Sequence, residues 1–318
     1  MTTPAPMDLR GHAHRADRAF RWLAIGAAAV VLLVLGLIAI TMTDRARPVL
    51  GAMGLEFFTS TRWSPADGAF GALPFLWGTV YTAIIATLLA VPVSLGVALF
   101  ITQVAPPWLK KPLVYMTDLL AVVPSVVFGL WGVLVLGGKI QGVYAAIHDA
   151  VDGIPVLQSI FGDSPQGRSF MTAGVILAIM IIPIITSLAR EVMETTPTAD
   201  KEAAYALGAT RWEMIGAAVL PHSKGGLVGA VMLGLGRAMG ETIATALVIG
   251  SALGQITTNV FASGNSMPAV IANEWGEADG LHKSALIALA VLLFALTILV
   301  NLIATAIVQR SMRRSRGA

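Results

Sequence analysis

Six long runs of apolar residues follow one another along the chain, separated by shorter polar segments. Each run reaches about the 20 residues that an α-helix needs to cross the hydrocarbon core of a membrane. The pattern therefore predicts an all-α integral membrane protein with six transmembrane helices, at residues 22–42, 73–102, 113–136, 170–188, 227–253 and 284–308.

The first run could instead belong to a cleaved secretion signal, because arginines precede it. Its apolar part is, however, longer than the roughly 7–15 residues of a signal-sequence core. No clear small-residue cleavage site follows it. We therefore expect a retained membrane helix.

Composition supports the membrane class and excludes several kinds of site. Charged residues make up only 12% of the chain, with a mean hydropathy of +0.78, whereas a soluble domain carries roughly 25%. The absence of cysteine excludes disulfides, thiolate metal sites and cysteine nucleophiles. The five histidines show no metal-ligand spacing. The net charge of +3 comes from basic residues between the apolar runs, which does not favour nucleic-acid binding.

Lysine and arginine are concentrated in alternate loops, which predicts the orientation of the chain. With the N-terminus inside, fourteen basic residues lie on the cytoplasmic side and six on the opposite side. Both termini are therefore expected in the cytoplasm. The predicted regions are a cytoplasmic tail at 1–20, a first helix with an outside loop at 21–72, a core of five helices at 73–309 and a basic cytoplasmic tail at 310–318.

The cytoplasmic loop at 190–225 is rich in helix-forming residues and has a proline near each end, Pro197 and Pro221. Thr198 is placed to cap a helix, and Gly208 interrupts the helical stretch and allows a tight turn. We therefore expect a helix–turn–helix across the membrane face, which suits docking into a groove of another protein.

Within this loop, Glu202, Ala203 and Ala204 are followed by Gly208 four positions later and by Pro221 thirteen positions after that glycine. The spacing resembles the EAA loop of ABC importer permeases with the type I fold. The resemblance implies that this loop contains the coupling helix that inserts into an ATPase subunit, and that these five residues take part in the coupling. An ordinary amphipathic loop helix is the alternative.

No phosphate-binding loop of the G-x-x-x-x-G-K-[ST] type occurs in the sequence. Residues 137–139, Gly-Gly-Lys, lack both the earlier glycine and the following hydroxyl. We therefore expect ATP and Mg²⁺ on a partner ATPase. The chain itself is expected to be no enzyme and to bind no cofactor.

Arg237 and Glu241 stand in the middle of the fifth predicted helix. A charge at the centre of a bilayer costs about 2.5–3.5 kcal/mol and needs a partner or a wet cavity. The two residues are four apart, so they would share one face of a continuous helix and could pair. Gly236 and Gly240 would let a neighbouring helix approach closely.

Two interpretations of this pair remain open. In one, the ion pair only locks the fifth helix against its neighbours. In the other, Arg237 lines a translocation path and binds an oxyanion through two parallel hydrogen bonds, while Glu241 holds the arginine when the site is empty. Thr242, Thr245 and Ser125 are further candidates for the path, although bonding of these hydroxyls within their own helices is the alternative.

Residues 236–242 read Gly-Arg-Ala-Met-Gly-Glu-Thr, and residues 124–130 read Pro-Ser-Val-Val-Phe-Gly-Leu. They resemble the R-A-x-G-E-T and P-S-V-V-x-G-L stretches of permeases in bacterial phosphate-specific (Pst) transport systems. Residues 17–21 and Glu56-Phe57 are more similar to the PstC branch of this family than to its PstA branch. The resemblance covers about residues 15–310.

The resemblance implies a multi-pass permease of the bacterial plasma membrane that imports inorganic phosphate. Its implied partners are a homologous PstA-like permease, a PstB-like ATPase dimer and a PstS-like binding protein on the outside. An importer of another oxyanion, molybdate or sulfate, is the alternative. A membrane enzyme would need a nucleophile, base or metal cluster on facing helices, and a secondary transporter would lack the EAA spacing.

Pro92, Pro124 and Pro183 lie within predicted helices, where each is expected to cause a kink. Asp118 lies near the inner end of the third predicted helix, where the Pst resemblance implies a longer acidic residue. The simplest interpretation is that its carboxylate reaches the inner membrane interface.

Overall fold

α-Helices form nearly all of the regular structure in the computed structural model, which describes residues 13–162 and 167–315. The long helices are α1 (Ala13–Met53), α3 (Leu73–Leu99), α8 (Phe170–Glu194), α11 (Leu220–Gly240) and α14 (Gly280–Ser315). The shorter helices are α2 (Glu56–Thr59), α4 (Pro107–Val122), α5 (Ser125–Trp131), α6 (Gly137–Ala150), α7 (Pro155–Ile160), α9 (Thr198–Ala206), α10 (Arg211–Met214), α12 (Ile243–Val248) and α13 (Met267–Glu274). Strands β1 (Trp63–Ser64) and β2 (Ala69–Phe70) form an antiparallel hairpin.

Six helical stretches of the described chain are long and apolar enough to cross a membrane, which confirms the predicted number. Each overlaps its predicted apolar run, but the ends differ. The stretches are Asp17–Met53, Leu73–Val104, Ser125–Ala150, Phe170–Glu194, Arg211–Gly240 and Gly280–Ala306. Of the expected tails, residues 1–12 and 316–318 lie outside the described chain. The predicted boundary between the first helix with its outside loop (21–72) and the core of five helices (73–309) stays a prediction.

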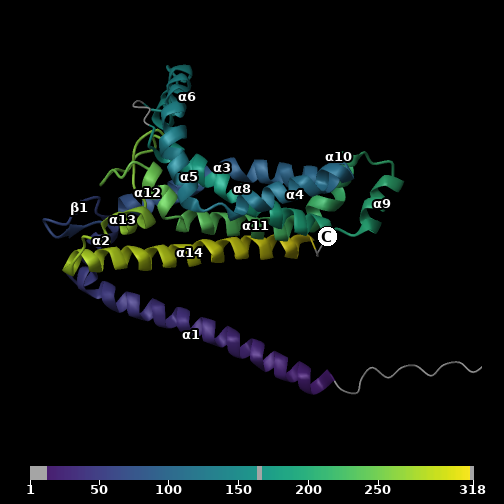
Figure 1. Cartoon of the computed structure of the whole chain (residues 1–318), viewed down its shortest axis with the longest axis horizontal. Helices are drawn as coiled ribbons and strands as arrows, with labels where there is room; N and C mark the ends of the chain where they lie inside the picture. The colour runs from purple at the N-terminus through teal and green to yellow at the C-terminus, as the bar shows by residue number, and fades with distance from the viewer. Residues whose placement is uncertain (1–12, 163–166, 316–318) are drawn as a thin grey trace, which may run out of the picture.

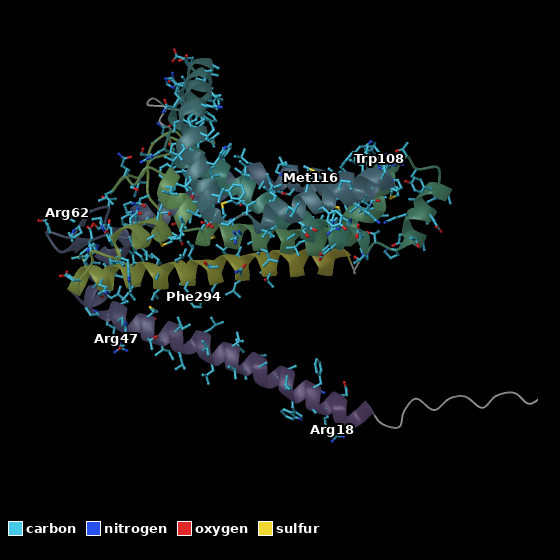
Figure 2. The ribbon with its side chains drawn as sticks, in the orientation of Figure 1. Arg18, Arg47, Arg62, Trp108, Met116 and Phe294 are labelled. Atoms are coloured by element: carbon cyan, nitrogen blue, oxygen red, sulfur yellow. The ribbon has the colours of Figure 1, made fainter. Side chains whose placement is uncertain are left out.

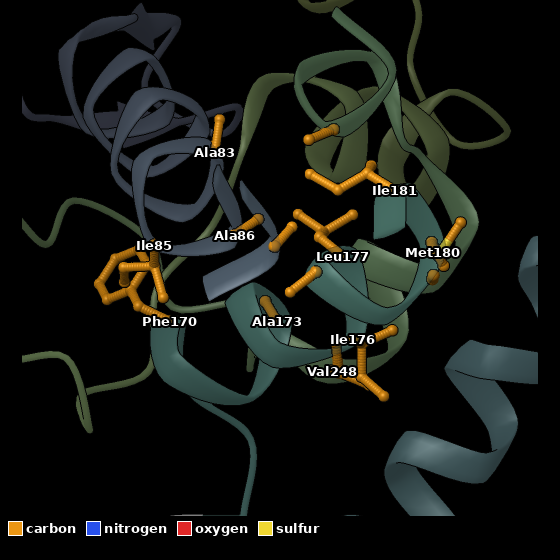
Figure 3. Close-up of a cluster of buried hydrophobic side chains, with 14 of the residues drawn as sticks. Ala83, Ile85, Ala86, Phe170, Ala173, Ile176, Leu177, Met180, Ile181 and Val248 are labelled. Carbon is orange, nitrogen blue, oxygen red and sulfur yellow. The ribbon is translucent and has the colours of Figure 1, made fainter. Parts of the chain in front are cut away.

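α3 and α8 pack along much of their length and form the centre of the helical body (Figure 1). Small and branched side chains fill the contact, among them Ala83, Ala86 and Leu177, each at most 1% exposed (Figure 3). Gly174 allows the close approach, because a Cβ there would collide with the side chain of Ile85. α11 packs on α8 and also contacts α3 and α14, so the body is built around α8.

α1 continues well past the predicted end of the first helix, although Pro48 interrupts its hydrogen bonds. Ser284 of α14 enters the gap. Its hydroxyl accepts a hydrogen bond from the backbone N–H of Val49 (3.2 Å) and donates one to the carbonyl of Arg45 (3.0 Å). A side chain of a neighbouring helix thereby completes the backbone bonding of α1. The two helices meet at this end and diverge toward the N-terminus of α1 (Figure 1).

The third predicted helix, at 113–136, is wrong as a single helix. It ends at Val122, and α5 begins at Ser125, because the residue before a proline avoids the helical region. The expected kink at Pro124 is therefore a break, whereas α3 and α8 continue through Pro92 and Pro183. α5, the π-helical turn at 132–136 and α6 form one stretch that runs across the direction of α8 (Figure 1).

Residues 249–266 form largely non-helical chain between α12 and α13. The end of this segment is fixed against α3, because the backbone N–H of Met267 donates to the Thr79 hydroxyl (2.9 Å). A Cβ at Gly78 would collide with the carbonyl oxygen of Asn265, so only glycine permits this crossing. The segment 254–283, which separates the fifth and sixth predicted helices, is thus packed chain with two helical parts, α13 and the start of α14.

Ser284→Ala removes a hydroxyl that serves two backbone groups of α1. A buried backbone group left without a partner costs about 1–3 kcal/mol, so we expect the free energy of unfolding to fall by that amount. Denaturation of the purified protein in detergent would measure it. Thr297→Ala is the matched control in α14, because the Thr297 hydroxyl donates only within its own helix, to Leu293. Equal losses in the two variants would contradict a bridging role for Ser284.

Candidate functional site

The fifth predicted helix is interrupted where its motif residues stand. α11 ends at Gly240, Glu241 has extended backbone (φ −70°, ψ 122°), and α12 begins at Ile243. The Glu241 carboxylate accepts a hydrogen bond from the backbone N–H of Ala244 (3.3 Å), and the Thr242 hydroxyl donates to the carbonyl of Gly240 (3.2 Å). Side chains at the break therefore satisfy backbone groups that the interrupted helix leaves open.

The expected pairing of Arg237 with Glu241 is wrong, because the helix ends between the two residues. Arg237 is exposed in the last turn of α11, whereas Glu241 is only 9% exposed. No ion pair among the described residues includes either side chain. Arg237 is therefore an exposed cation at a helix C-terminus, the end that favours positive charge.

Helices α5 and α12 form a close pair, and Ser125 lies at the end of this pair where the α11–α12 break also lies. A Cβ at Gly129 would be 2.9 Å from Ala244 Cα, and one at Gly132 would be 2.7 Å from Val248 Cγ1. α5 and α12 therefore run in the same direction in close contact. Because Ser125 is the first residue of α5, the pair begins with Ser125 on one helix and the α11–α12 break on the other.

The two threonine candidates behave differently. Thr242 is partly buried, and its hydroxyl bonds back to α11 as described above. Thr245 is 2% exposed, and its hydroxyl has no hydrogen-bond partner in the described part of the chain. The alternative interpretation, in which the hydroxyl bonds within its own helix, therefore does not apply to Thr245.

α9, Gly208 and α10 form the helix–turn–helix predicted from the loop. Gly208 has φ +83°, in the left-handed region that glycine adopts without strain. Thr210 and Glu213 form a capping box: the Thr210 hydroxyl accepts from the Glu213 N–H (3.4 Å), and the Glu213 carboxylate accepts from the Thr210 N–H (2.7 Å). Thr198, expected as a cap, is instead the first helical residue after Pro197.

Pro221 lies inside a continuous helix and does not end the loop. α10, the π-helical turn at 215–219 and α11 follow one another without interruption and form the span Arg211–Gly240. Proline lacks the N–H that would bond the carbonyl four residues earlier, and the wider turn directly before it accommodates the gap. One helix thus joins the loop to Arg237.

Glu202 and Ala203 are exposed on α9, whereas Ala204 packs against a buried cluster at this end of the body. Large apolar side chains beside them are also exposed, and sequence reasoning missed them. They are Tyr205 (46%), Leu207 (89%) and Trp212 (69%). Their signal was the presence of aromatic residues and a leucine in a polar loop. Such a surface is typical of a protein-binding site.

The two groups of candidate residues lie far apart. α9 and α10 stand at one end of the body, and α5 and α12 lie toward the other (Figure 1). Within residues 13–162 and 167–315, no group of three or more His, Asp or Glu side chains could hold a metal ion.

Residues 90–313 match the family model described as "Binding-protein-dependent transport system inner membrane component". The chain belongs to this family. It is a membrane component of a transporter and not an enzyme. With its six apolar helices, this permease is a multi-pass protein of the plasma membrane.

The permease has relatives along nearly its whole length. It is 42% identical to the phosphate transport system permease protein PstC of Xylella fastidiosa, over 98% of this chain and 96% of the relative. The protein of the same name from Mesorhizobium japonicum is 42% identical over 92% of this chain and 90% of its own length. The resemblance to Pst permeases read from the motifs is thereby confirmed.

Solved structures resemble the permease in fold. A chain of a bacterial ABC transporter that imports the polysaccharide alginate superposes with a TM-score of 0.56 at 17% identity, covering 93% of this chain and 98% of that chain. A chain of the MetNI methionine ABC transporter in an inward-facing conformation gives 0.56 at 16% identity, covering 74% and 94%. The predicted type I ABC importer permease fold is therefore confirmed.

Glu241→Ala removes the carboxylate that accepts a hydrogen bond from the backbone N–H of Ala244 in the first turn of α12. Loss of a side-chain bond to an open N–H of a helix start costs about 0.5–2 kcal/mol, so we expect the free energy of unfolding in detergent to fall by that amount. Glu241→Gln keeps an acceptor oxygen and is the matched control. Arg237→Gln should change the value by about 0.5 kcal/mol or less. A loss for Arg237→Gln as large as that for Glu241→Ala would instead indicate that the two residues pair.

Proposed function

We propose that this permease is a subunit of an ATP-driven importer of inorganic phosphate. The similarity to PstC proteins over 98% of the chain supports this substrate, and the exposed Arg237 at a helix break carries the proposal chemically. A guanidinium group can donate two parallel hydrogen bonds to the oxygens of one phosphate.

In this proposal, Ser125, Thr242, Glu241 and Arg237 belong to the substrate path. Ser125 and Thr242 supply hydroxyls at the start of the α5–α12 pair. Glu241 holds the break in place through its bond to Ala244 and does not neutralise Arg237. The arginine thus keeps its charge for the passing anion, and the glutamate acts as a positioning residue.

The proposed orientation places both termini and the α9 end in the cytoplasm. The excess of lysine and arginine at that end supports this assignment. The basic residues there include Lys110, Lys111, Lys201, Arg211 and Lys224. The opposite end, with β1, β2 and α13, then faces a phosphate-binding protein of the PstS type.

The other proposed partners are a homologous PstA-like permease and a PstB-like ATPase dimer that binds ATP and Mg²⁺. Glu202, Ala203, Ala204, Gly208 and Pro221 belong to the coupling contact, and the exposed apolar side chains beside them support docking of a protein there. Closure of the ATPase would move α9, and the continuous helix Arg211–Gly240 would carry that movement to Arg237. In this proposal, that movement opens the substrate path alternately to the outside and to the cytoplasm.

Uptake of radiolabelled phosphate tests the substrate and the arginine together. The permease and its cognate subunits are expressed in cells that lack their own high-affinity system, with sulfate and molybdate as competitors. Loss of a hydrogen-bonded charge contact lowers affinity by about tenfold or more, so Arg237→Gln should reduce uptake at least that far while the subunits still copurify. Arg45→Gln, at an exposed arginine of α1, is the matched control.

Normal uptake by the assembled Arg237→Gln variant would exclude Arg237 from the path. Uptake of labelled molybdate or sulfate by the assembled wild type, without uptake of phosphate, would replace phosphate by that oxyanion.

Gly208→Val tests the coupling segment. A left-handed conformation costs a branched residue about 1–2 kcal/mol, so the turn should rearrange and bind the ATPase about 5- to 30-fold more weakly. Copurification of the ATPase in detergent and phosphate-stimulated ATP hydrolysis would measure this loss. Gly216→Val is the matched control, because Gly216 is exposed with nothing within 4 Å of an added Cβ. Unchanged ATPase binding by Gly208→Val would place the contact elsewhere.

A further inference from the structure

Asp118 lies further along its helix from the end of the helical body than the sequence indicated. The third apolar run was expected to begin at Leu113, but α4 begins at Pro107 and carries Lys110 near its start. At 1.5 Å per residue, Asp118 stands about 12 Å further along the axis than Lys110. An aspartate side chain is too short to span that distance to the interface. The interpretation that its carboxylate reaches the inner interface therefore does not fit α4.

The face of α4 that carries Asp118 points away from the rest of the chain. Tyr115, Leu119 and Val122 are spaced along the same side of the helix and are 66%, 70% and 78% exposed. Asp118 is exposed among them. α4 packs on α8 through its other side (Figure 1), and Met116 of α4, labelled in Figure 2, is also exposed (67%). The result is an apolar stripe with one carboxylate in it.

No side chain of this permease neutralises Asp118. Within the described residues it takes part in no ion pair or hydrogen bond. Lys110 pairs with Glu194 at the end of α8 (3.0 Å), and Lys111 lies about two turns away along the same face. α4 packs on α8, whose stretch Phe170–Glu194 is long and apolar enough to cross a membrane. A carboxylate beside that stretch, about 12 Å from the Lys110–Glu194 end, is costly against lipid and requires a cation or water.

Both ends of α4 are held in place, so the stripe is presented in a fixed position. The Lys110–Glu194 ion pair fixes the beginning of α4 to α8. At the other end, α5 is packed closely on α12 through Gly129. α4 itself has no buried residue. Because α4 is anchored at both ends and exposes its apolar stripe along its length, another protein can pack on that stripe.

We propose that Asp118 forms an ion pair with a basic side chain of the second permease subunit, and that the stripe Tyr115, Asp118, Leu119 and Val122 packs on a membrane helix of that subunit. The inference rests on the proposed function, which supplies the second permease. Charge complementarity selects the occupant, because the acyl chains of lipid offer no cation at this depth.

Copurification of the second permease with a tagged copy of this chain tests the pair. Asp118→Asn removes the negative charge and leaves the partner cation unpaired, so we expect at least about tenfold less second permease to be retained in detergent. Asp118→Glu should retain it. Asp149→Asn, at an exposed position of α6, is the matched control for loss of a carboxylate. Because Asp118 has no partner within the chain, the amount of Asp118→Asn in the membrane should equal that of wild type.

Charge reversal identifies the partner residue. Asp118→Lys should abolish assembly, and selection for restored phosphate uptake should yield substitutions of a basic residue in a membrane helix of the second permease. Full assembly of Asp118→Asn, with or without transport, would overturn the ion pair. A wild-type complex that contains no second permease would instead show that the proposed function fails, and the inference with it.

Discussion

The need to satisfy every backbone N–H and C=O group within the chain shapes this molecule, because the interior of a membrane offers no water to do so. Long helices meet the need along most of the path, and the informative places are those where a helix is interrupted. At Pro48 of α1, Ser284 of another helix completes the bonding on both sides of the proline. At the end of α11, the side chains of Glu241 and Thr242 bond to the backbone around the break.

The same interruptions position the chemistry. Ending α11 at Gly240 places Arg237 in a final helical turn, and it separates the arginine from Glu241. Starting α5 directly after Pro124 lets two short helices, α5 and α12, lie parallel with glycine at their contact. The site is therefore built from helix ends. The uninterrupted run Arg211–Gly240 connects this site to the surface segment around Gly208 at the far end of the body, so one rigid element reaches both.

Two exposed charges of the chain fit the proposal that a second subunit completes the path. Arg237 and Asp118 stand on different helices, and neither has an opposite charge within the described residues. Both are costly to leave against lipid. The proposed function supplies a partner for each charge. A basic side chain of the second permease subunit would pair with the carboxylate of Asp118, and the passing anion would bind the guanidinium of Arg237.

Much of this protein was determined by local sequence. Hydropathy predicted six membrane helices because partition into lipid depends on each segment alone, and the turn at Gly208 followed from a conformation that only glycine adopts freely. The resemblance of residues 202–221 and 236–242 to family motifs led to the correct family. The ends of the helices were decided by tertiary contacts. Where α1 passes Pro48, Ser284 of α14 bonds to its backbone, and the pairing of Arg237 with Glu241 failed because the chain breaks at the α5–α12 contact. Hydropathy reports whether a residue prefers lipid to water, but the place where a helix stops depends on which distant groups are available to bond its open backbone.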